Sequence, residues 1–180
     1  MVTYAAFLRG INVGGYNTVS MPDLRKAFEH IGFKKVNTIL VSGNVVFESK
    51  KGNLNSLAQS IERQLEHTFG SHFSVMVFTI VDIQKLIKAN LFKEIKVTPQ
   101  TRLYITFLAH PVKIRLKHNW PDEAFRILAI KNRTVFSVLD LSKTGTTQSM
   151  NVLEKIFGRN ITTRNWNTIL KINTIFSHQV

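Results

Sequence analysis

The first 80 residues show an ordered succession of strand-like and helix-like hydrophobic patterns. Short runs rich in β-branched and aromatic residues predict strands, and apolar residues three or four positions apart predict helices. Ser20 and Asp23 stand ahead of the first helical run in the spacing typical of a helix start. The predicted elements are strands at 4–8, 38–41, 45–47 and 73–80 and helices at 24–31 and 54–69, with a turn at Ser42-Gly43-Asn44. This β-α-β-β-α-β order is that of a ferredoxin-like unit.

The second part of the chain begins as the first does. Tyr4-Ala5-Ala6-Phe7-Leu8 matches Tyr104-Ile105-Thr106-Phe107-Leu108, and Ile39-Leu40 with Val46-Phe47 resembles Ile127-Leu128 with Val135-Phe136. Two matches in the same order favour a pseudo-duplication. The predicted elements are helices at 82–89, 112–118, 151–157 and 163–176 and strands at 103–108, 125–130 and 134–139. The second copy is therefore expected to have a helix in place of its last strand.

The pattern as a whole predicts an α+β protein with two related halves, residues 1–90 and 91–180, the second ending in a helix. The net charge of +13 is unevenly shared, because the first half carries 10 basic and 6 acidic residues and the second 14 and 5. An excess of this kind favours anionic partners such as nucleic acid or nucleotides. The charges are dispersed along the chain, so solubility alone is an equally good interpretation.

Several function classes lack their residues in this sequence. The absence of cysteine excludes disulfides, thiol catalysis and thiolate metal sites, and it indicates an intracellular, cytoplasmic location. The six histidines form no metal-binding spacing, so we predict no metal and no cofactor. No stretch reaches the roughly 20 apolar residues of a membrane span, so no membrane partner is expected. No motif specifies a reaction, which leaves open whether the protein is an enzyme, because catalytic sets are geometric rather than sequential.

A glycine-bearing loop is the strongest candidate for a binding site. The segment Leu8-Arg9-Gly10-Ile11-Asn12-Val13-Gly14-Gly15 lies between a predicted strand and a predicted helix N-terminus. Glycines let backbone N–H groups turn toward an anion, and a helix N-terminus favours negative charge. The segment lacks the spacing of a dinucleotide-binding loop or a P-loop, so a purely structural turn is the alternative interpretation.

Topology places a second polar turn beside this loop. The first and second strands of a ferredoxin-like unit run parallel, so their carboxyl ends share one sheet edge. Arg9 and Asn12 are then expected to converge with Ser42 and Asn44. Ligand sites tend to fall at the carboxyl ends of strands, although that rule was framed for parallel sheets.

A third polar segment precedes the last predicted helix. Thr162 or Thr163 is the expected N-cap, and Trp166 is the expected apolar anchor. Arg164 would then stand in the first helical turn, where a cation opposes the helix dipole, so its placement calls for a carboxylate or a ligand. The predicted ligand-binding residues are Arg9, Gly10, Asn12, Gly14, Ser42, Asn44, Arg164 and Asn165.

Three stretches of the chain resemble the signature segments of domain-of-unknown-function family 1697. They are Leu8-Arg9-Gly10-Ile11-Asn12-Val13-Gly14-Gly15, Ser42-Gly43-Asn44-Val45-Val46-Phe47 and Thr162-Thr163-Arg164-Asn165-Trp166-Asn167-Thr168. The resemblance implies a bacterial α+β protein with two interlocked ferredoxin-like halves and mostly antiparallel sheets. It implies no reaction.

The function hypothesis that follows is a cytosolic protein that binds a small anionic, nucleotide- or phosphate-like ligand at the glycine-loop edge. The alternatives are a protein that binds nucleic acid non-specifically through its basic second half, an enzyme with an unrecognised site, or an interaction scaffold. Sequence-specific RNA recognition is disfavoured, because neither Val45-Val46-Phe47 nor Thr134-Val135-Phe136 carries the paired stacking aromatics of an RNA-recognition sheet. The oligomeric state is not predicted.

Overall fold

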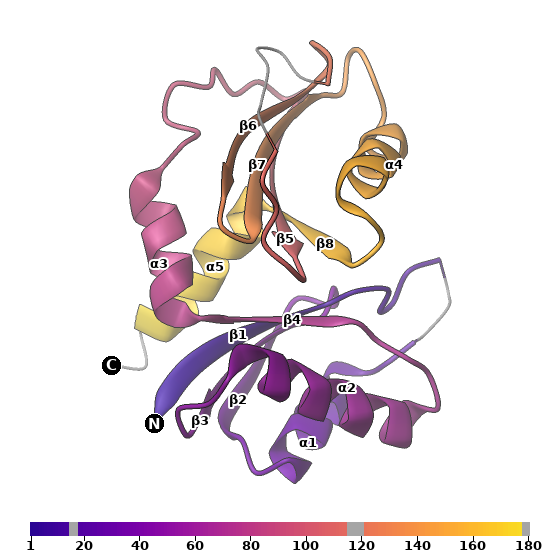
Figure 1. The fold of residues 1–180 in the computed structure, drawn as a ribbon, viewed down its shortest axis with the longest axis vertical. Helices are drawn as coiled ribbons and strands as arrows, with labels where there is room; N and C mark the ends of the chain where they lie inside the picture. Colours follow the sequence, from indigo (N-terminus) through magenta and orange to yellow (C-terminus); the bar gives the residue numbers. More distant parts are fainter. Residues whose placement is uncertain (15–17, 115–120, 178–180) are drawn as a thin grey trace. The chain divides into compact units, whose positions relative to one another are not determined.

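The chain forms two compact units, each with its own sheet (Figure 1). The computed structural model describes residues 1–14, 18–114 and 121–177. The first unit comprises residues 1–86 and the C-terminal segment from Lys171, and the second comprises residues 87–170. The chain returns to its first unit at its end, so the first unit is built from two separate stretches of sequence and the second from one.

The first unit is an antiparallel sheet of order β2-β3-β1-β4 with two helices on one face (Figure 1). Both β1 and β2 are antiparallel to β3, so they run parallel to each other, as the ferredoxin-like order requires. The elements are β1 (Val2–Leu8), α1 (Met21–His30), β2 (Lys34–Ile39), β3 (Asn44–Ser49), α2 (Leu54–Phe69) and β4 (Val75–Thr79), and α3 (Ile80–Ala89) follows.

Alternation along the central strand builds the core of this unit. Tyr4, Ala6 and Leu8 face the helices and are almost fully buried. Phe47 is the centre of an aromatic cluster, with ring centroids 4.4 Å from Phe33 and 5.5 Å from Phe28. Offset and edge-on aromatic contacts add to the burial of apolar area, so they fix the helices on the sheet.

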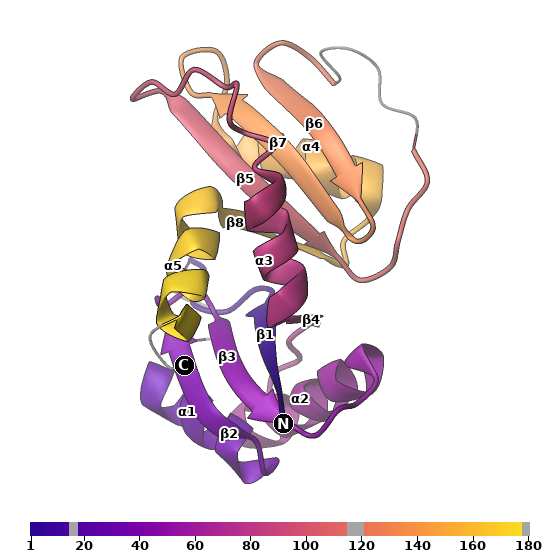
Figure 2. The same cartoon turned by 90° about the vertical axis from the view of Figure 1, so that its left-hand side faces the viewer.

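The second unit repeats the sheet, and among its described residues one helix, α4, packs on the sheet as α1 and α2 do in the first unit. Its strand order is β6-β7-β5-β8, again with antiparallel neighbours, and α4 covers one face of the sheet (Figure 2). The elements are β5 (Thr101–Leu108), β6 (Phe125–Lys131), β7 (Thr134–Asp140), α4 (Thr146–Phe157), β8 (Ile161–Asn165) and α5 (Trp166–Ser177), the last of which is shared between the units. Leu108, Leu139 and Leu153 join the sheet to α4.

The two sheets match in register, which confirms the predicted duplication. The N–H of Leu8 donates to the carbonyl of Gly43 at 2.8 Å, and that of Leu108 donates to the carbonyl of Arg133 at 2.8 Å. Asn44 opposes Phe7 as Thr134 opposes Phe107, so positions on β3 and β7 differ by 90. Val46 therefore corresponds to Phe136, one residue away from the pairing that the sequence suggested.

The end of the second copy differs from the prediction. Ile161–Asn165 forms a strand paired with β5, so the last strand is present and was not replaced by a helix. The last helix begins at Trp166, which places Thr162, Thr163 and Arg164 in a strand rather than at a helix start. Pairing with an open edge of β5 outweighs the capping pattern, and the β-branched run Ile161-Thr162-Thr163 suits a strand.

Two helix predictions also change. The helix expected at 112–118 is not formed at residues 112–114, and residues 115–118 lie outside the described part of the chain. Helix α4 begins at Thr146, five residues earlier than the apolar pattern indicated, because its first turn is polar. Within the described ranges, none of the helices has the length and apolar character that crossing a membrane requires.

Candidate functional site

The glycine loop and the turn between β2 and β3 meet at one edge of the first sheet. The Leu8 N–H donates to the Gly43 carbonyl at 2.8 Å, and the Arg9 N–H donates to the Ser74 carbonyl at 2.9 Å. These hydrogen bonds join the end of β1 to the residue before β3 on one side and to the residue before β4 on the other. The predicted proximity of the two turns is confirmed, and we call this region the glycine-loop edge, defined as residues 9–14 and 40–44.

Asn12 fastens the loop in place with its side chain. Its Nδ2 donates to the carbonyl of Val41 at 2.9 Å and to that of Val19 at 3.1 Å, and its Oδ1 accepts from the Val19 N–H at 2.8 Å. One side chain therefore links the loop, the β2–β3 turn and the residue before the N-cap of α1. Asn12 positions the site, because its amide is engaged by the backbone on both sides.

Asn44 has a similar role at the other side of the edge. It is fully buried, and its Nδ2 donates to the carbonyl of Ile39 at 2.8 Å and to Ser42 Oγ at 3.0 Å. These bonds close the turn from Leu40 to Gly43. Buried amides usually find such partners, so Asn44 shapes the turn, while the exposed Ser42 lies at the surface of the edge.

The sign of φ alternates along the loop. The φ angle is positive at Gly10 (76°), Asn12 (54°) and Gly14 (59°) and negative at Arg9, Ile11 and Val13. Where right- and left-handed residues alternate, successive N–H groups turn toward one side and attract anions, and the sign of φ in this loop is that of such a backbone. Arg9, half-buried at the start of the loop, adds a guanidinium to the same segment. Gly15 lies outside the described residues.

The N-terminus of α1 has the capping arrangement that the sequence predicted. Ser20 caps the helix by accepting from the Asp23 N–H at 3.2 Å, and the Asp23 carboxylate accepts from Ser20 Oγ at 2.6 Å. A carboxylate in the first turn already complements the helix dipole.

An exposed apolar rim borders the loop. Val13 is 65% exposed, Val41 68% and Leu40 46%, and the Asn12–Val41 hydrogen bond holds the two turns together. Leu40 also has a left-handed φ of 59°, an uncommon conformation for a branched side chain. Leu40 and Val41 are not among the predicted site residues, although two apolar residues beside a polar turn are a signal that the sequence does contain.

Arg164 and Asn165 lie in the second unit, on β8. Arg164 is 8% exposed, and its guanidinium donates to Thr162 Oγ1 at 2.7 Å and to the Thr163 carbonyl at 2.9 Å. Burial lowers the pKa of Arg164 to about 10, so the side chain remains cationic at neutral pH. Neighbouring strand residues provide hydrogen bonds for this cation, which explains its placement without a helix dipole.

Asn165 ends β8 and opens the last helix. Its Oδ1 accepts from the Asn167 N–H at 2.9 Å, so Asn165, rather than Thr162 or Thr163, caps the first turn of α5. It also lines a cavity of about 280 Å³ with Trp166, Asn167 and Arg102. Trp166 is 8% exposed and packs edge-on against Phe92 at 5.2 Å, which confirms it as an anchor.

The described residues offer no obvious metal centre. No group of three or more histidine, aspartate or glutamate side chains gathers closely enough among them to hold an ion. The chemistry available at the glycine-loop edge is therefore that of backbone N–H groups, one guanidinium, a hydroxyl and an apolar rim.

The fold and the glycine-loop edge together define a class of small protein: two ferredoxin-like units, with a polar turn at the edge of the first sheet. Residues 1–134 match the family described as protein of unknown function (DUF1697), and the chain belongs to that family. No curated protein matches it. A solved structure, that of the conserved bacterial protein SP0830 from Streptococcus pneumoniae, has the same fold, with a TM-score of 0.74, 23% identity and coverage of 98% of this chain and 99% of that chain.

Proposed function

We propose that this is a cytoplasmic protein that binds a small anion, phosphate- or nucleotide-like, at the glycine-loop edge. The observation that carries the proposal is the alternation of φ at Gly10, Asn12 and Gly14. A backbone shaped in this way concentrates N–H dipoles on one side, and it does so without a carboxylate among residues 9–14. Arg9 would supply the second, charged contact, since a guanidinium binds phosphate in a two-pronged manner.

The surroundings of the loop favour an anion that also has an apolar part. Val13, Leu40 and Val41 stand exposed beside the loop, and apolar surface next to a cationic group suits an organic phosphate better than inorganic phosphate. The shape of this surface is fixed in advance by the bonds of Asn12 and Asn44. A preformed site loses little conformational entropy on binding.

Calorimetric titration with AMP and with inorganic phosphate tests the proposal. We expect saturable binding of AMP, and Arg9→Ala is expected to weaken it by about tenfold or more, because a hydrogen bond to a charged group contributes about 1.5–3 kcal/mol. Arg63→Ala is the matched control, since Arg63 is an exposed arginine on α2 in the same unit. Equal affinities in the two variants, or no saturable heat with either probe, would contradict the proposal.

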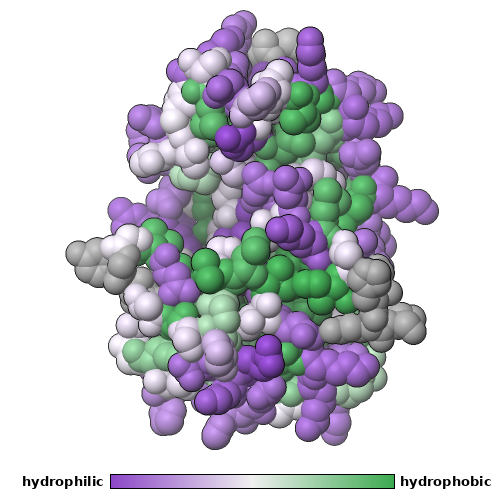
Figure 3. Space-filling model, turned by 180° about the vertical axis from the view of Figure 1, so that it is seen from behind, coloured by the Kyte–Doolittle hydropathy of each residue, from purple (hydrophilic) through white to green (hydrophobic). Residues whose placement is uncertain are grey.

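The main alternative is non-specific nucleic-acid binding through the basic second half. Its salt dependence distinguishes it from the binding of a small ligand. A protein that contacts several phosphates through dispersed lysines loses affinity steeply as salt rises. On the face shown in Figure 3, hydrophilic side chains are spread over the surface and interrupted by hydrophobic patches instead of forming one continuous block. A steep loss of nucleic-acid binding as salt rises would favour that alternative, and binding that is insensitive to salt would count against it.

A further inference from the structure

The second unit contains a cavity of about 490 Å³ that lies apart from the glycine-loop edge in the sequence and in the fold. Its floor is the face of the second sheet opposite α4, where Thr101, Arg126 and Val138 lie on neighbouring strands. One wall is the segment between α3 and β5, including Ile95 and Lys96. The volume is in the range of small-molecule sites, and the lining combines apolar and charged side chains.

The acidic residues at this cavity already have partners. Glu94 lies 3.7 Å from Lys93, and Glu123 lies 3.8 Å from Lys143. The Asp140 carboxylate accepts from the Ser142 hydroxyl at 2.6 Å and from the Ser142 N–H at 3.0 Å. Each of these carboxylates therefore already has a cation or a hydrogen-bond donor of the protein beside it.

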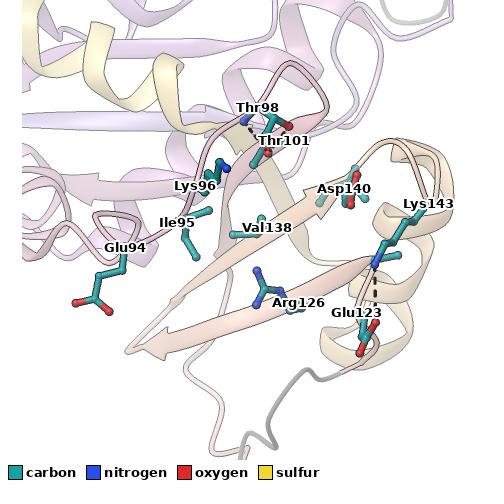
Figure 4. Close-up of a pocket in the computed structure, with 12 residues that line it drawn as sticks. Glu94, Ile95, Lys96, Thr98, Thr101, Glu123, Arg126, Val138, Asp140 and Lys143 are labelled. Carbon is teal, nitrogen blue, oxygen red and sulfur yellow. Dashed lines mark hydrogen bonds and ion pairs between the residues drawn. The ribbon is translucent and has the colours of Figure 1, made fainter.

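Two cations remain. Among the described residues, neither the Arg126 guanidinium nor the Lys96 ammonium has a hydrogen bond or an ion pair, although both line the cavity. Figure 4 shows Lys96 and Arg126 on two sides of Val138, with the Glu123–Lys143 pair at the other end of the cavity beside Asp140.

The first unit has an acidic residue at the position that Val138 occupies in the second. Val138 corresponds in the duplicated register to Glu48, since Leu103 opposes Val138 as Thr3 opposes Glu48. Lys34 opposes Glu48 as Arg126 opposes Val138, and the adjacent Lys35 forms an ion pair with Glu48 at 2.9 Å. In the second unit the acid is replaced by valine, so the cation on the edge strand faces the cavity without an internal partner.

We propose that this cavity is a second binding site, for a small organic anion whose carboxylate or phosphate group lies between Arg126 and Lys96. The guanidinium would hold the anionic head in a two-pronged contact. Ile95 and Val138 would contact the apolar part of the ligand. This site is independent of the glycine-loop edge and does not rest on the function proposed for it.

Titration of isotopically labelled protein, followed by amide NMR at constant ionic strength, tests the inference. The probes are sodium butyrate and sodium phosphate, which separate a carboxylate ligand from a phosphate ligand. We expect at least one probe to cause saturable shifts at residues 94–98, 126 and 138–140. Shifts at residues 10–14 and 40–44 would report on the glycine-loop edge instead, so the two sites succeed or fail separately.

Three variants complete the experiment. Arg126→Ala is expected to weaken binding at the cavity by about tenfold or more. Arg159→Ala, an exposed arginine in the same unit, leaves the affinity unchanged. Val138→Glu restores the acid found in the first unit and is expected to abolish binding by pairing with Arg126. Dispersed amide spectra show that each variant is folded. Absence of saturable shifts at the cavity with both probes, or undiminished affinity in Arg126→Ala, overturns the inference.

Discussion

Gly43 is the residue at which the glycine-loop edge is most tightly built. Its φ is +70°, and a Cβ added there would lie 2.5 Å from Ile11 Cγ2 and 2.9 Å from Leu8 Cβ. The Leu8 contact involves an atom fixed to the backbone of β1, so it cannot swing aside. A glycine is required here both for its conformation and for the close approach of the two turns.

Gly43→Ala is therefore expected to lower the free energy of unfolding by about 2–4 kcal/mol, combining left-handed strain with overpacking. Gly32→Ala is the matched control, because Gly32 has a φ of +91° but nothing within 4 Å of an added Cβ. Gly32→Ala should lower the free energy of unfolding by about 1–2 kcal/mol, from the left-handed conformation alone. Chemical denaturation of both variants measures the difference, and equal costs would contradict the close approach.

Asp140 gives a pH-dependent prediction at the same scale. The Ser142 side-chain hydrogen bond, followed by the Ser142 backbone hydrogen bond, lowers the pKa of the Asp140 carboxyl below its ordinary value of 3.8. A lowered folded-state pKa stabilises the fold above the unfolded pKa, and that contribution is lost as the pH falls below about 3.8.

Ser142→Ala should raise the pKa of Asp140 toward its ordinary value, because it removes the larger of the two hydrogen bonds. Ser142→Thr keeps the hydroxyl and should keep the lowered pKa. Carboxyl carbon NMR titrations of both variants provide the measurement. The same Asp140 titration curve in Ser142→Ala and in the unsubstituted protein would argue against this cause.

Among the helices, α4 has the weakest start. Gly145 occupies its N-cap position with φ −89° and ψ 161° and offers no side-chain hydrogen bond, whereas Asn53 caps α2 through the N–H groups of Asn55 and Ser56. The backbone at Gly145 is in an extended conformation that any residue can adopt. The atom nearest to an added Cβ is Gln148 Oε1, at the flexible end of a side chain.

Gly145→Asp is expected to raise the free energy of unfolding by about 0.5–1 kcal/mol, because it supplies a cap and a negative charge at the helix start. Gly145→Ala lacks the capping oxygen and is the control. Thermal unfolding of the two variants distinguishes capping from a general loss of glycine flexibility. If alanine stabilises the protein as much as aspartate, the capping explanation is wrong.

The elements that sequence patterns predicted best are those with a strong period and clear punctuation. Helix α2 runs from Leu54 to Phe69 as predicted, since Asn53 caps its start and Gly70, with φ 67°, ends it. Strand β8 was missed because Thr162-Thr163-Arg164 reads equally well as a helix start. Only pairing with β5, more than 50 residues away, decides between the two, and a local pattern carries no information on that partner.

The candidate sites show the same limit. The meeting of the Arg9 loop with the Ser42 turn follows from the element order alone, so the sequence predicts it. That Asn12 and Asn44 use their amides to hold backbone carbonyls does not follow, because it depends on distances across the edge. Arg126 was missed entirely, although its place between Phe125 and Ile127 on an alternating strand puts it on the opposite face of the sheet.

In the molecule as a whole, the positions at which the two units differ indicate where binding sites should be sought. Both units keep the register of their central strands, yet only the first keeps the glycine loop, and only the second replaces Glu48 with an apolar residue, Val138. Matching positions that differ in charge or in glycine content are those at which the copies have diverged. We infer that the two units bind different anions.

The central claim is that the glycine-loop edge binds a small organic phosphate, and amide NMR of the labelled protein titrated with AMP tests it most directly. The account predicts that the largest saturable shifts occur at residues 10–14 and 40–44 and that Arg9→Ala reduces them. Saturable shifts that spare both segments, or no saturable shift anywhere, would contradict it.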